Sequence, residues 1–376
     1  MKKYLLIRLG AIGDIVLATA AIEAISQAEP GSQIDLICKA RFAGVLKGHP
    51  KLANVYSFDE AGRHKGLRGL LLFIHELSAG ASTDIAHGDG SMLTTGETRR
   101  SISSYAKASA DYPPCASHKP DKSGWISAQA GKKYNFILDL QNNQRSRMIT
   151  LCLNAGKKIH WPKDTWRRRM LVWGQGKGKA YKTVIQRYLA AVEKAGIKQP
   201  EAKPKLYPVA DPSIKLPQGG FIAIAPGAHW PTKRWPGYAS LIAKMQNANF
   251  KMIVVGDKSD KAIADEITAA AGDGIINFCG KLDLAQLTYV LSKAKLLVTN
   301  DTGAMHIAEA AGTPVVAVFG STVKQFGFAP WRPESRVIET ELDCRPCALH
   351  GSTKCPKGHF NCMKLITADQ VKDSMV

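Results

Sequence analysis

Two short motifs hold acidic residues that could do chemistry, and each lies between a predicted strand and a predicted helix. Asp14 ends the turn "RLGAIGD", and Asp301 lies near the start of "NDTGAMH". Asp, Asn and Thr are ordinary helix N-cap residues, so each motif could simply cap the helix that follows. In open parallel sheets, however, ligands bind beyond the carboxyl ends of strands, and a helix N-terminus there attracts phosphate. Both motifs are therefore candidates for a ligand site as well as for capping.

The glycine turn before Asp14 differs from the turn that binds a dinucleotide. Gly10 and Gly13 follow a predicted strand directly, at a place where glycines could hold a pyrophosphate. Their spacing is G-x-x-G-D, whereas the dinucleotide fingerprint is G-x-G-x-x-G. An acidic side chain at the start of the helix would also repel phosphate. The motif favours a carboxylate that acts on a neutral group.

A cationic loop follows the first strand predicted in the second half of the chain. Thr232, Lys233 and Arg234 lie between Trp230 and Trp235 in "APGAHWPTKRWPGY". Lysine suits a diphosphate as a point charge, and arginine suits it as a planar fork. The alternative is a solvated basic loop, which the flanking tryptophans disfavour.

Alternating strand and helix patterns predict the elements that hold these motifs. Helices are expected at residues 15–28 and 66–77 and after the later strands. The predicted strands are residues 3–9, 33–39, 134–140, 221–227, 251–257, 274–280, 295–301 and 314–320. This alternation is typical of parallel sheets covered by helices, so an α/β fold with two Rossmann-like halves is predicted.

Two segments interrupt the pattern. A Pro-rich joint near residues 198–218 predicts a division into domains 1–205 and 206–376, with a ligand cleft between them. Residues 78–132 are rich in Ser, Ala and Gly and poor in large aliphatic side chains, which predicts a disordered insertion in the first domain. The alternative for this insertion is an active-site lid or a partner-binding arm.

The charge of the chain predicts an anionic partner. Lys and Arg number 51 against 31 Asp and Glu, a formal net charge of +20. Residues 133–205 alone hold 17 basic and 4 acidic residues. Nucleic acid, a membrane surface or a phosphorylated substrate would each suit this excess. Arg8 and Asp14 interrupt the apolar run at the N-terminus, so we expect a cytoplasmic protein and not a signal peptide.

Four motifs together resemble a known family. "RLGAIGDIVLATAAI", "PGAHWPTKRWP", "NDTGAMHIAEAAGTPVVAVFG" and "CRPCALHGSTKCPKGHFNCM" look like the ADP-heptose:lipopolysaccharide heptosyltransferases of glycosyltransferase family 9, in that family's order. The resemblance covers nearly the whole chain except residues 78–132. It implies a GT-B fold, in which two Rossmann-like domains face each other across a cleft. It also implies an inverting transfer of heptose from ADP-heptose to the inner core of lipopolysaccharide.

The resemblance implies roles for individual residues. Asp14 matches the family's general base, and Asp301 is placed to hydrogen-bond the heptose hydroxyls. The donor-binding residues implied are Thr232, Lys233, Asp301, Thr302, Gly303 and His306. A carboxylate for the donor ribose has no clear match, and the candidates are Asp257, Asp260 and Glu266.

The expected acceptor is a phosphorylated Kdo–lipid A at the anionic cytoplasmic face of the inner membrane, with no nucleic-acid partner. Trp166 and Trp173 would serve as interfacial aromatics. The acceptor-binding residues expected are Gly13, Arg145, Arg147, Arg167, Arg168 and Arg169. The alternative is a scattered solvated basic surface.

No cofactor or metal ion is expected in the reaction. The sequence holds no Asp-x-Asp motif, so Lys233 and a helix dipole would take the place of Mg²⁺ at the diphosphate. Cys344, Cys347, Cys355 and Cys362 cluster near the end of the chain, with His350 and His359 among them. Structural zinc, reduced thiols and a disulfide all remain open for this cluster.

Other functions explain fewer of these features. A nicotinamide-dependent oxidoreductase lacks its fingerprint here, and a nucleic-acid-binding protein has no use for the Asp-Thr-Gly site. The alternatives kept are a non-catalytic sugar-nucleotide-binding protein and a family-9 transferase that uses another nucleotide sugar.

Overall fold

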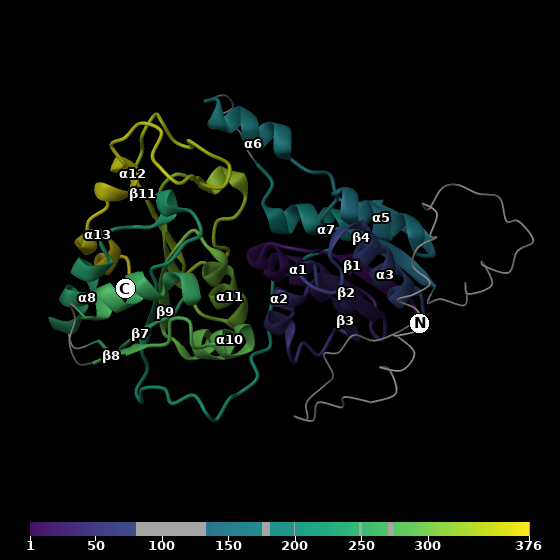
Figure 1. The fold of residues 1–376 in the computed structure, drawn as a ribbon, viewed down its shortest axis with the longest axis horizontal. Coiled ribbons are helices and arrows are strands. Elements are labelled where there is room, and N and C mark those ends of the chain that lie inside the picture. The colour runs from purple at the N-terminus through teal and green to yellow at the C-terminus, as the bar shows by residue number, and fades with distance from the viewer. Residues whose placement is uncertain (80–132, 175–180, 199, 248–249, 270–273, 376) are drawn as a thin grey trace, which may run out of the picture.

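The computed structural model has two halves, each built on a parallel sheet (Figure 1). It describes residues 1–79, 133–174, 181–198, 200–247, 250–269 and 274–375. The predicted insertion at residues 78–132 lies almost wholly outside the described residues. The halves lie side by side, and α6 (Thr165–Val172) stands above the junction between them.

The N-terminal half has a five-stranded sheet in the order β3-β2-β1-β4-β5. Its inner strands β2, β1 and β4 are largely apolar and buried because helices cover both faces of the sheet. The strands are β1 (Lys3–Ile7), β2 (Gln33–Lys39), β3 (Asn54–Phe58), β4 (Tyr134–Asp139) and β5 (Ala155–His160). The helices are α1 (Ile12–Ala28), α2 (Ala40–Ala43), η1 (Gly44–Leu46), α3 (Gly66–Ala79), α5 (Gln144–Cys152), α6 and α7 (Val184–Lys194).

The C-terminal half has a six-stranded sheet in the order β11-β10-β9-β6-β7-β8. Its strands are β6 (Ile222–Ala225), β7 (Met252–Val254), β8 (Ile275–Asn277), β9 (Leu296–Asn300), β10 (Val315–Phe319) and β11 (Arg336–Glu339). Its helices are η2 (Pro231–Lys233), α8 (Tyr238–Asn247), η3 (Lys258–Asp260), α9 (Lys261–Ala269), α10 (Leu284–Lys293), α11 (Gly303–Ala311), η4 (Lys324–Phe326), α12 (Asn361–Lys364) and α13 (Ala368–Asp373).

The predicted α/β class is confirmed, and three strands were not predicted. β5 has mostly exposed residues, including Lys157 and Lys158, because it lies at the edge of its sheet. β11 is also an edge strand, and β3 is the edge strand on the other side of the first sheet. Thr232 and Lys233, expected in an irregular loop, form the short 3₁₀ helix η2.

Helices α1 and α11 pack against each other across the junction, and two glycines of the predicted motifs allow their close approach. A Cβ at Gly13 would lie 2.6 Å from Cδ2 of His306. A Cβ at Gly303 would clash with the side chain of Ile12. The junction therefore brings the N-termini of both helices, and with them Asp14 and Asp301, to the same place.

Candidate active site

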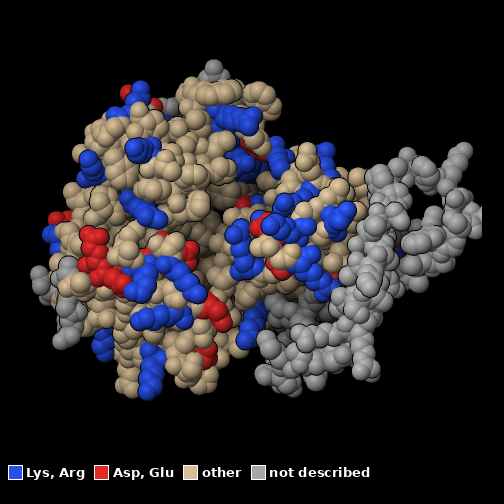
Figure 2. Space-filling view, in the orientation of Figure 1, with Lys and Arg blue, Asp and Glu red and all other residues tan. Residues whose placement is uncertain are grey.

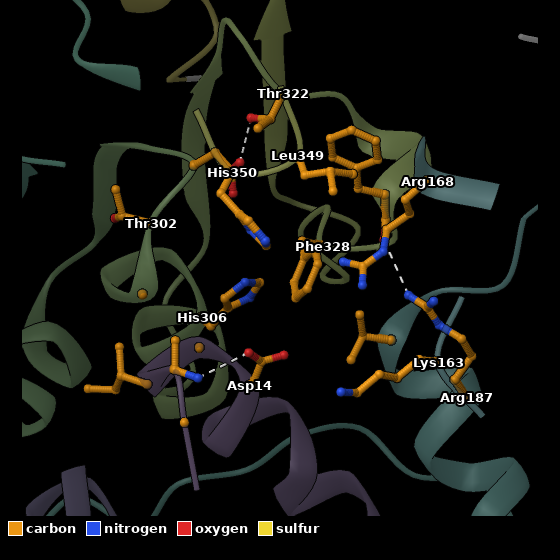
Figure 3. A pocket seen from close by; sticks show the side chains of 18 of the residues that line it. Asp14, Lys163, Arg168, Arg187, Thr302, His306, Thr322, Phe328, Leu349 and His350 are labelled. Carbon is orange, nitrogen blue, oxygen red and sulfur yellow. Dashed lines mark hydrogen bonds between the residues drawn. The ribbon is translucent and has the colours of Figure 1, made fainter. Parts of the chain in front are cut away.

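A cleft of about 510 Å³ lies between the two halves, beyond the carboxyl ends of both sheets (Figure 3). Its lining residues come from both halves. We call the residues of one side the C-terminal wall: Lys233, Asp301, Thr302, Gly303, His306 and Thr322. We call the residues of the other side the N-terminal wall: Arg8, Asp14, Lys163, Arg168 and Arg187.

Asp301 lies in the C-terminal wall as a buried carboxylate with two partners. Its Oδ2 lies 2.7 Å from the Nζ of Lys233 and accepts a hydrogen bond of 2.6 Å from the hydroxyl of Thr322. Burial alone would raise the pKa of Asp301, but the Lys233 charge and these hydrogen bonds outweigh it and lower the pKa. Asp301 is therefore ionised, and its charge is balanced by Lys233.

The first turn of α11 has no side-chain cap. Thr302 is the N-cap residue by position, but its side chain makes no capping hydrogen bond, and Asp301 is engaged elsewhere. Asn300 instead fastens the neighbouring loop, since its Nδ2 donates to the carbonyl of Pro226 at 2.8 Å and its Oδ1 accepts from the Trp235 amide at 3.1 Å. The capping alternative thus fails for Asp301, and a helix N-terminus faces the cleft, where an anion would be favoured.

His306 contributes a neutral imidazole to the same wall. Burial lowers its pKa to about 4, against the opposing effect of Asp301 and Asp14. Its ring lies nearly parallel to that of Trp331, with centroids 6.0 Å apart. Its Nδ1 is buried and has no hydrogen-bond partner among the described residues. A neutral ring in this position suits hydrogen bonding to a polar ligand.

Asp14 both caps its helix and faces the cleft, so the two alternatives raised by the sequence hold together. Its Oδ2 accepts a hydrogen bond from the Ala11 amide at 3.2 Å and pairs with Arg8 at 2.6 Å. The hydroxyl of Tyr188 donates to Oδ1 at 3.4 Å. Arg8 is itself held by the carbonyl of Leu140, 2.7 Å from its Nη1. The carboxylate is oriented from three directions, and Figure 3 shows it at the cleft opposite His306.

Three further cations give the N-terminal wall an excess of positive charge. The pKa of each of Lys163, Arg168 and Arg187 is lowered, first by burial and also by repulsion from neighbouring cations. Asp164 lies 3.4 Å from Arg187 and partly balances it. Figure 2 shows many Lys and Arg side chains on the N-terminal half and at the α6 arm. The wall is therefore prepared for an anionic ligand.

Not all of the predicted acceptor residues reach the cleft. Gly13 and Arg168 line it, and Gly13 also packs on His306. Arg145 pairs with Glu60 at 3.1 Å. The remaining residues outside the lining are Arg147, which donates to Asn142 at 2.8 Å, Arg167, which pairs with Asp164 at 3.0 Å, and the exposed Arg169.

Some predicted donor residues also lie outside the lining. Thr232 is buried and exchanges hydrogen bonds with the backbone of Ser352, at 2.8 and 2.9 Å, so it has a structural role. Of the three ribose candidates, Asp257 bonds the Ser259 amide at 2.7 Å, and Asp260 lies against Gly227. Glu266 is exposed on α9. None of these three carboxylates lines the cleft.

The Cys-rich segment contributes to the cleft through its loop and not through its cysteines. Among the described residues, no group of three or more His, Cys, Asp and Glu side chains is arranged to hold a metal ion. Cys344 lies 3.9 Å from Nε2 of His359, and the four cysteines of the segment are free thiols in this structure. His350 and Leu349, in contrast, line the cleft.

Among the lining residues that the sequence did not point to are four residues of the two walls, Arg8, Lys163, Arg187 and Thr322, together with His350. Arg8 carried a usable signal, because an arginine in an apolar strand just before a glycine turn needs a buried partner. Nothing in the sequence distinguished Lys163 and Arg187 from the other basic residues of the same region. His350 was considered only with the cysteines.

Comparison with known proteins identifies the family of the chain. The profile of glycosyltransferase family 9 (heptosyltransferase) matches residues 128–356. Lipopolysaccharide heptosyltransferase 2 of Salmonella typhimurium is 27% identical over 230 residues, which are 55% of this chain and 65% of that protein. The chain thus spans slightly less than two thirds of the curated relatives it matches first.

Two solved structures share the fold. A glycosyltransferase of family 9 from Veillonella parvula has a TM-score of 0.70 at 17% identity, covering 99% of this chain and 96% of that one. The ADP-heptose lipopolysaccharide heptosyltransferase II of E. coli has a TM-score of 0.67 at 20% identity, covering 100% and 97%. The matched profile covers more than half of the chain, and the chain belongs to glycosyltransferase family 9 (heptosyltransferase).

Proposed function

We propose that the protein is an inverting heptosyltransferase that moves a heptose from ADP-heptose to a phosphorylated Kdo–lipid A acceptor of the inner core. The observation that carries this proposal is the meeting of an oriented carboxylate, Asp14, with an uncapped helix N-terminus and Lys233 across one cleft. Glycosyl transfer needs a base for the acceptor hydroxyl and stabilisation for the departing diphosphate. In this proposal the N-terminal wall supplies the base, and the C-terminal wall stabilises the diphosphate.

The C-terminal wall suits the donor. The diphosphate would lie at the first turn of α11, near Lys233, where free amides and a cation favour negative charge. Asp301 and His306 would then face the sugar and bond its hydroxyls. No metal ion takes part in this arrangement, since Lys233 and the helix supply the positive potential. The E. coli neighbour is named for ADP-heptose, which is the donor we propose here.

The N-terminal wall suits the acceptor and the base. Asp14 would take the proton of the acceptor hydroxyl as that oxygen attacks the anomeric carbon from the face opposite the diphosphate. Lys163, Arg168 and Arg187 would hold the carboxylates or phosphates of the acceptor, because charge-assisted hydrogen bonds to arginine are the strong ones. An anionic acceptor is expected for such a wall.

We propose that the protein is cytoplasmic and peripheral to the inner membrane, and that α6 contacts the membrane surface. Among the described residues, no helix combines the length and apolar character that a bilayer crossing needs. Trp166 and Trp173 are 69% and 63% exposed, and Met170 lies between them on the same helix face. Their ring centroids lie 6.2 Å apart, and the exposed Arg169 lies on the same helix. Exposed aromatics next to cations favour the interface of an anionic bilayer.

A transfer assay tests the proposed activity. Purified protein is incubated with the phosphorylated Kdo–lipid A acceptor and, in separate reactions, with ADP-heptose or with other nucleotide sugars. We expect heptose transfer with ADP-heptose only. Binding of ADP-heptose without transfer would favour a non-catalytic sugar-nucleotide-binding protein, and transfer from another donor would favour a different family-9 transferase.

Vesicle binding tests the membrane proposal. Vesicles with anionic lipid should bind the protein in a salt-sensitive way, and neutral vesicles should bind it weakly. Replacing Arg167, Arg168 and Arg169 by alanine should weaken this binding, and so should the pair Trp166→Ala and Trp173→Ala. Equal binding by both variants and the wild type would contradict a role for α6.

A further inference from the structure

One feature of the family motifs has no role in the proposal above: the loop of the Cys-rich segment that carries His350 into the cleft. Figure 3 shows its imidazole and that of His306 pointing into the same space, with Arg168 across from them. His350 comes from a segment far along the chain from Lys233, yet both line the cleft.

The loop is fastened directly to the helix that carries Lys233. The amide of Ser352 donates to the Thr232 hydroxyl at 2.8 Å, and that hydroxyl donates to the Ser352 carbonyl at 2.9 Å. The Thr232 amide donates to the same carbonyl at 3.2 Å. Gly351 has φ +99°, and a Cβ there would lie 3.1 Å from Cγ of Lys233. Any shift of this loop would therefore move His350 and Lys233 together.

A second anchor fixes the other side of the segment. The Arg345 guanidinium donates to the carbonyls of Phe319 and Thr322 at 3.1 and 2.9 Å, at the end of β10. Thr322 in turn bonds Asp301. Leu349 packs beside Leu171 of α6 and Phe326. His350 is thus held where the two walls meet, although its own side chain remains accessible from the cleft.

From this placement we propose that His350 is a second ligand of the donor diphosphate, beside Lys233, and that it binds a phosphate oxygen as a protonated imidazolium. The inference rests on the donor site proposed above. In the transfer step, the acceptor oxygen bonds to the anomeric carbon and its proton goes to Asp14. The bond from that carbon to the phosphate oxygen breaks, and its electron pair stays on the phosphate. His350 keeps its proton throughout and stabilises ADP until ADP leaves.

The charges around His350 make its protonation depend on whether the diphosphate is bound. Partial burial, Arg168 and Lys233 lower its pKa in the unliganded protein, while Asp14 and Asp301 act in the opposite direction. His306 also faces the space. A bound diphosphate would offset the two cations, so His350 would gain a proton when ADP binds. Loss of one charge-assisted hydrogen bond would weaken ADP binding about tenfold.

Calorimetric titration of the full chain with ADP tests the inference, with His350→Ala, His350→Gln and the exposed His75→Gln as a control. Titrations at pH 6.5 and 8.5, in buffers of different ionisation enthalpy, give both affinity and proton uptake. We expect His350→Ala to bind about tenfold more weakly at pH 6.5, while His350→Gln, which keeps a donor but cannot titrate, should match the wild type only at pH 8.5. Proton uptake should be smaller in both variants than in the wild type.

The comparison between variants removes the contributions of other titrating groups. The terminal phosphate of ADP takes part in every titration, and His306, with its pKa lowered to about 4, is neutral at both pH values, so the difference from the wild type reports His350. Unchanged affinity and proton uptake in both His350 variants would overturn the inference while leaving the donor site intact. Failure of the wild type to bind ADP would instead overturn the donor site, and this inference with it.

Discussion

The two walls of the cleft hold their charges in opposite ways. In the C-terminal wall, Lys233 and Asp301 balance each other at 2.7 Å, and His306 is neutral. In the N-terminal wall, the pair of Arg8 and Asp14 is joined by further cations that burial and mutual repulsion disfavour. The charges of the C-terminal wall are balanced without a ligand. The N-terminal wall keeps an excess of positive charge that an anionic ligand would neutralise.

The walls also differ in what supports them. The C-terminal wall lies at the ends of β9 and β10, whose residues are all buried. Two of the five residues of the N-terminal wall, Lys163 and Arg168, lie in the loop before α6 and on α6 itself. Lys163 is exposed, and only Leu171 of the helix is buried. We infer that donor binding uses a rigid, preformed site, and that the acceptor is gripped by a surface that adjusts to it.

The largest effect is expected at Asp14. Asp14→Asn keeps the size of the side chain and an oxygen for the Ala11 amide but removes the carboxylate that we propose as the base. We expect kcat to fall by about 10²–10⁴-fold, the usual contribution of a positioned base. Asp164→Asn is the control, because Asp164 pairs with Arg187 of the same wall without lining the cleft. Near-normal turnover by Asp14→Asn would remove Asp14 from the catalytic role.

The next largest effect is a difference in the free energy of unfolding between substitutions in the two walls. Lys233→Met leaves Asp301 buried without its cation, which should lower the free energy of unfolding by about 3–5 kcal/mol. Adding Asp301→Asn should restore most of this loss without restoring ADP binding. Arg168→Ala, which removes an unfavourably placed cation, should change stability by less than about 0.5 kcal/mol. Urea denaturation measures all three, and equal losses in Lys233→Met and Arg168→Ala would contradict the contrast between the walls.

A buried acid behind the C-terminal wall should make stability depend on pH. Burial raises the pKa of Glu309 to about 7, although its carboxylate accepts bonds from the Trp331 and Arg332 amides and from Ser335. The pKa of Glu309 is higher in the folded protein than its ordinary value of 4.5. The protonated side chain therefore contributes its full stabilisation below pH 4.5, and this stabilisation is lost as the pH rises through about 7.

The variant Glu309→Gln tests this pH dependence. Between pH 5 and pH 8 the wild type should lose about 2.5 kcal/mol that Glu309→Gln does not lose, since one pKa unit corresponds to about 1.4 kcal/mol. Unfolding at several pH values measures the difference. Parallel stability profiles for the two proteins would show that the hydrogen bonds to Glu309 offset its burial.

The smallest effect is expected at Arg168. Arg168→Ala should raise the KM for the acceptor about tenfold by removing one hydrogen bond to a charged group, with kcat and ADP affinity nearly unchanged. The matched control is Arg145→Ala, which breaks an exposed pair with Glu60 outside the cleft. If both variants raised KM equally, the effect would come from the general charge of the N-terminal half.

The same contrast explains what the sequence could predict. The C-terminal wall was found almost complete, because Asp301 to His306 follow one strand end and Lys233 follows a neighbouring strand. Of its residues only Thr322 was missed, and the neighbouring His350 was missed as well, since the position of both depends on how later loops fold back. The N-terminal wall draws on residues 8, 14, 163, 168 and 187, and no local pattern joins them. Five arginines were predicted for the acceptor from charge alone, and only Arg168 lines the cleft.

Fold prediction shows a similar limit. The buried strands, such as β1, β9 and β10, have apolar runs that local pattern reveals. β5 was missed because its Lys-rich edge position gives it the composition of a loop. The close approach of α1 to α11 depends on Gly13 and Gly303 meeting side chains of the other half. Neither glycine signals its partner in the sequence.

We propose that the two carboxylates of the cleft serve different substrates, and binding of ADP-heptose to one variant of each tests this most directly. Asp14→Asn should bind ADP-heptose with nearly the affinity of the wild type, because Asp14 lies in the N-terminal wall, which we propose binds the acceptor. Asp301→Ala should bind ADP-heptose more weakly, with a smaller loss for ADP alone. Loss of ADP-heptose binding in Asp14→Asn, with normal binding in Asp301→Ala, would contradict the account.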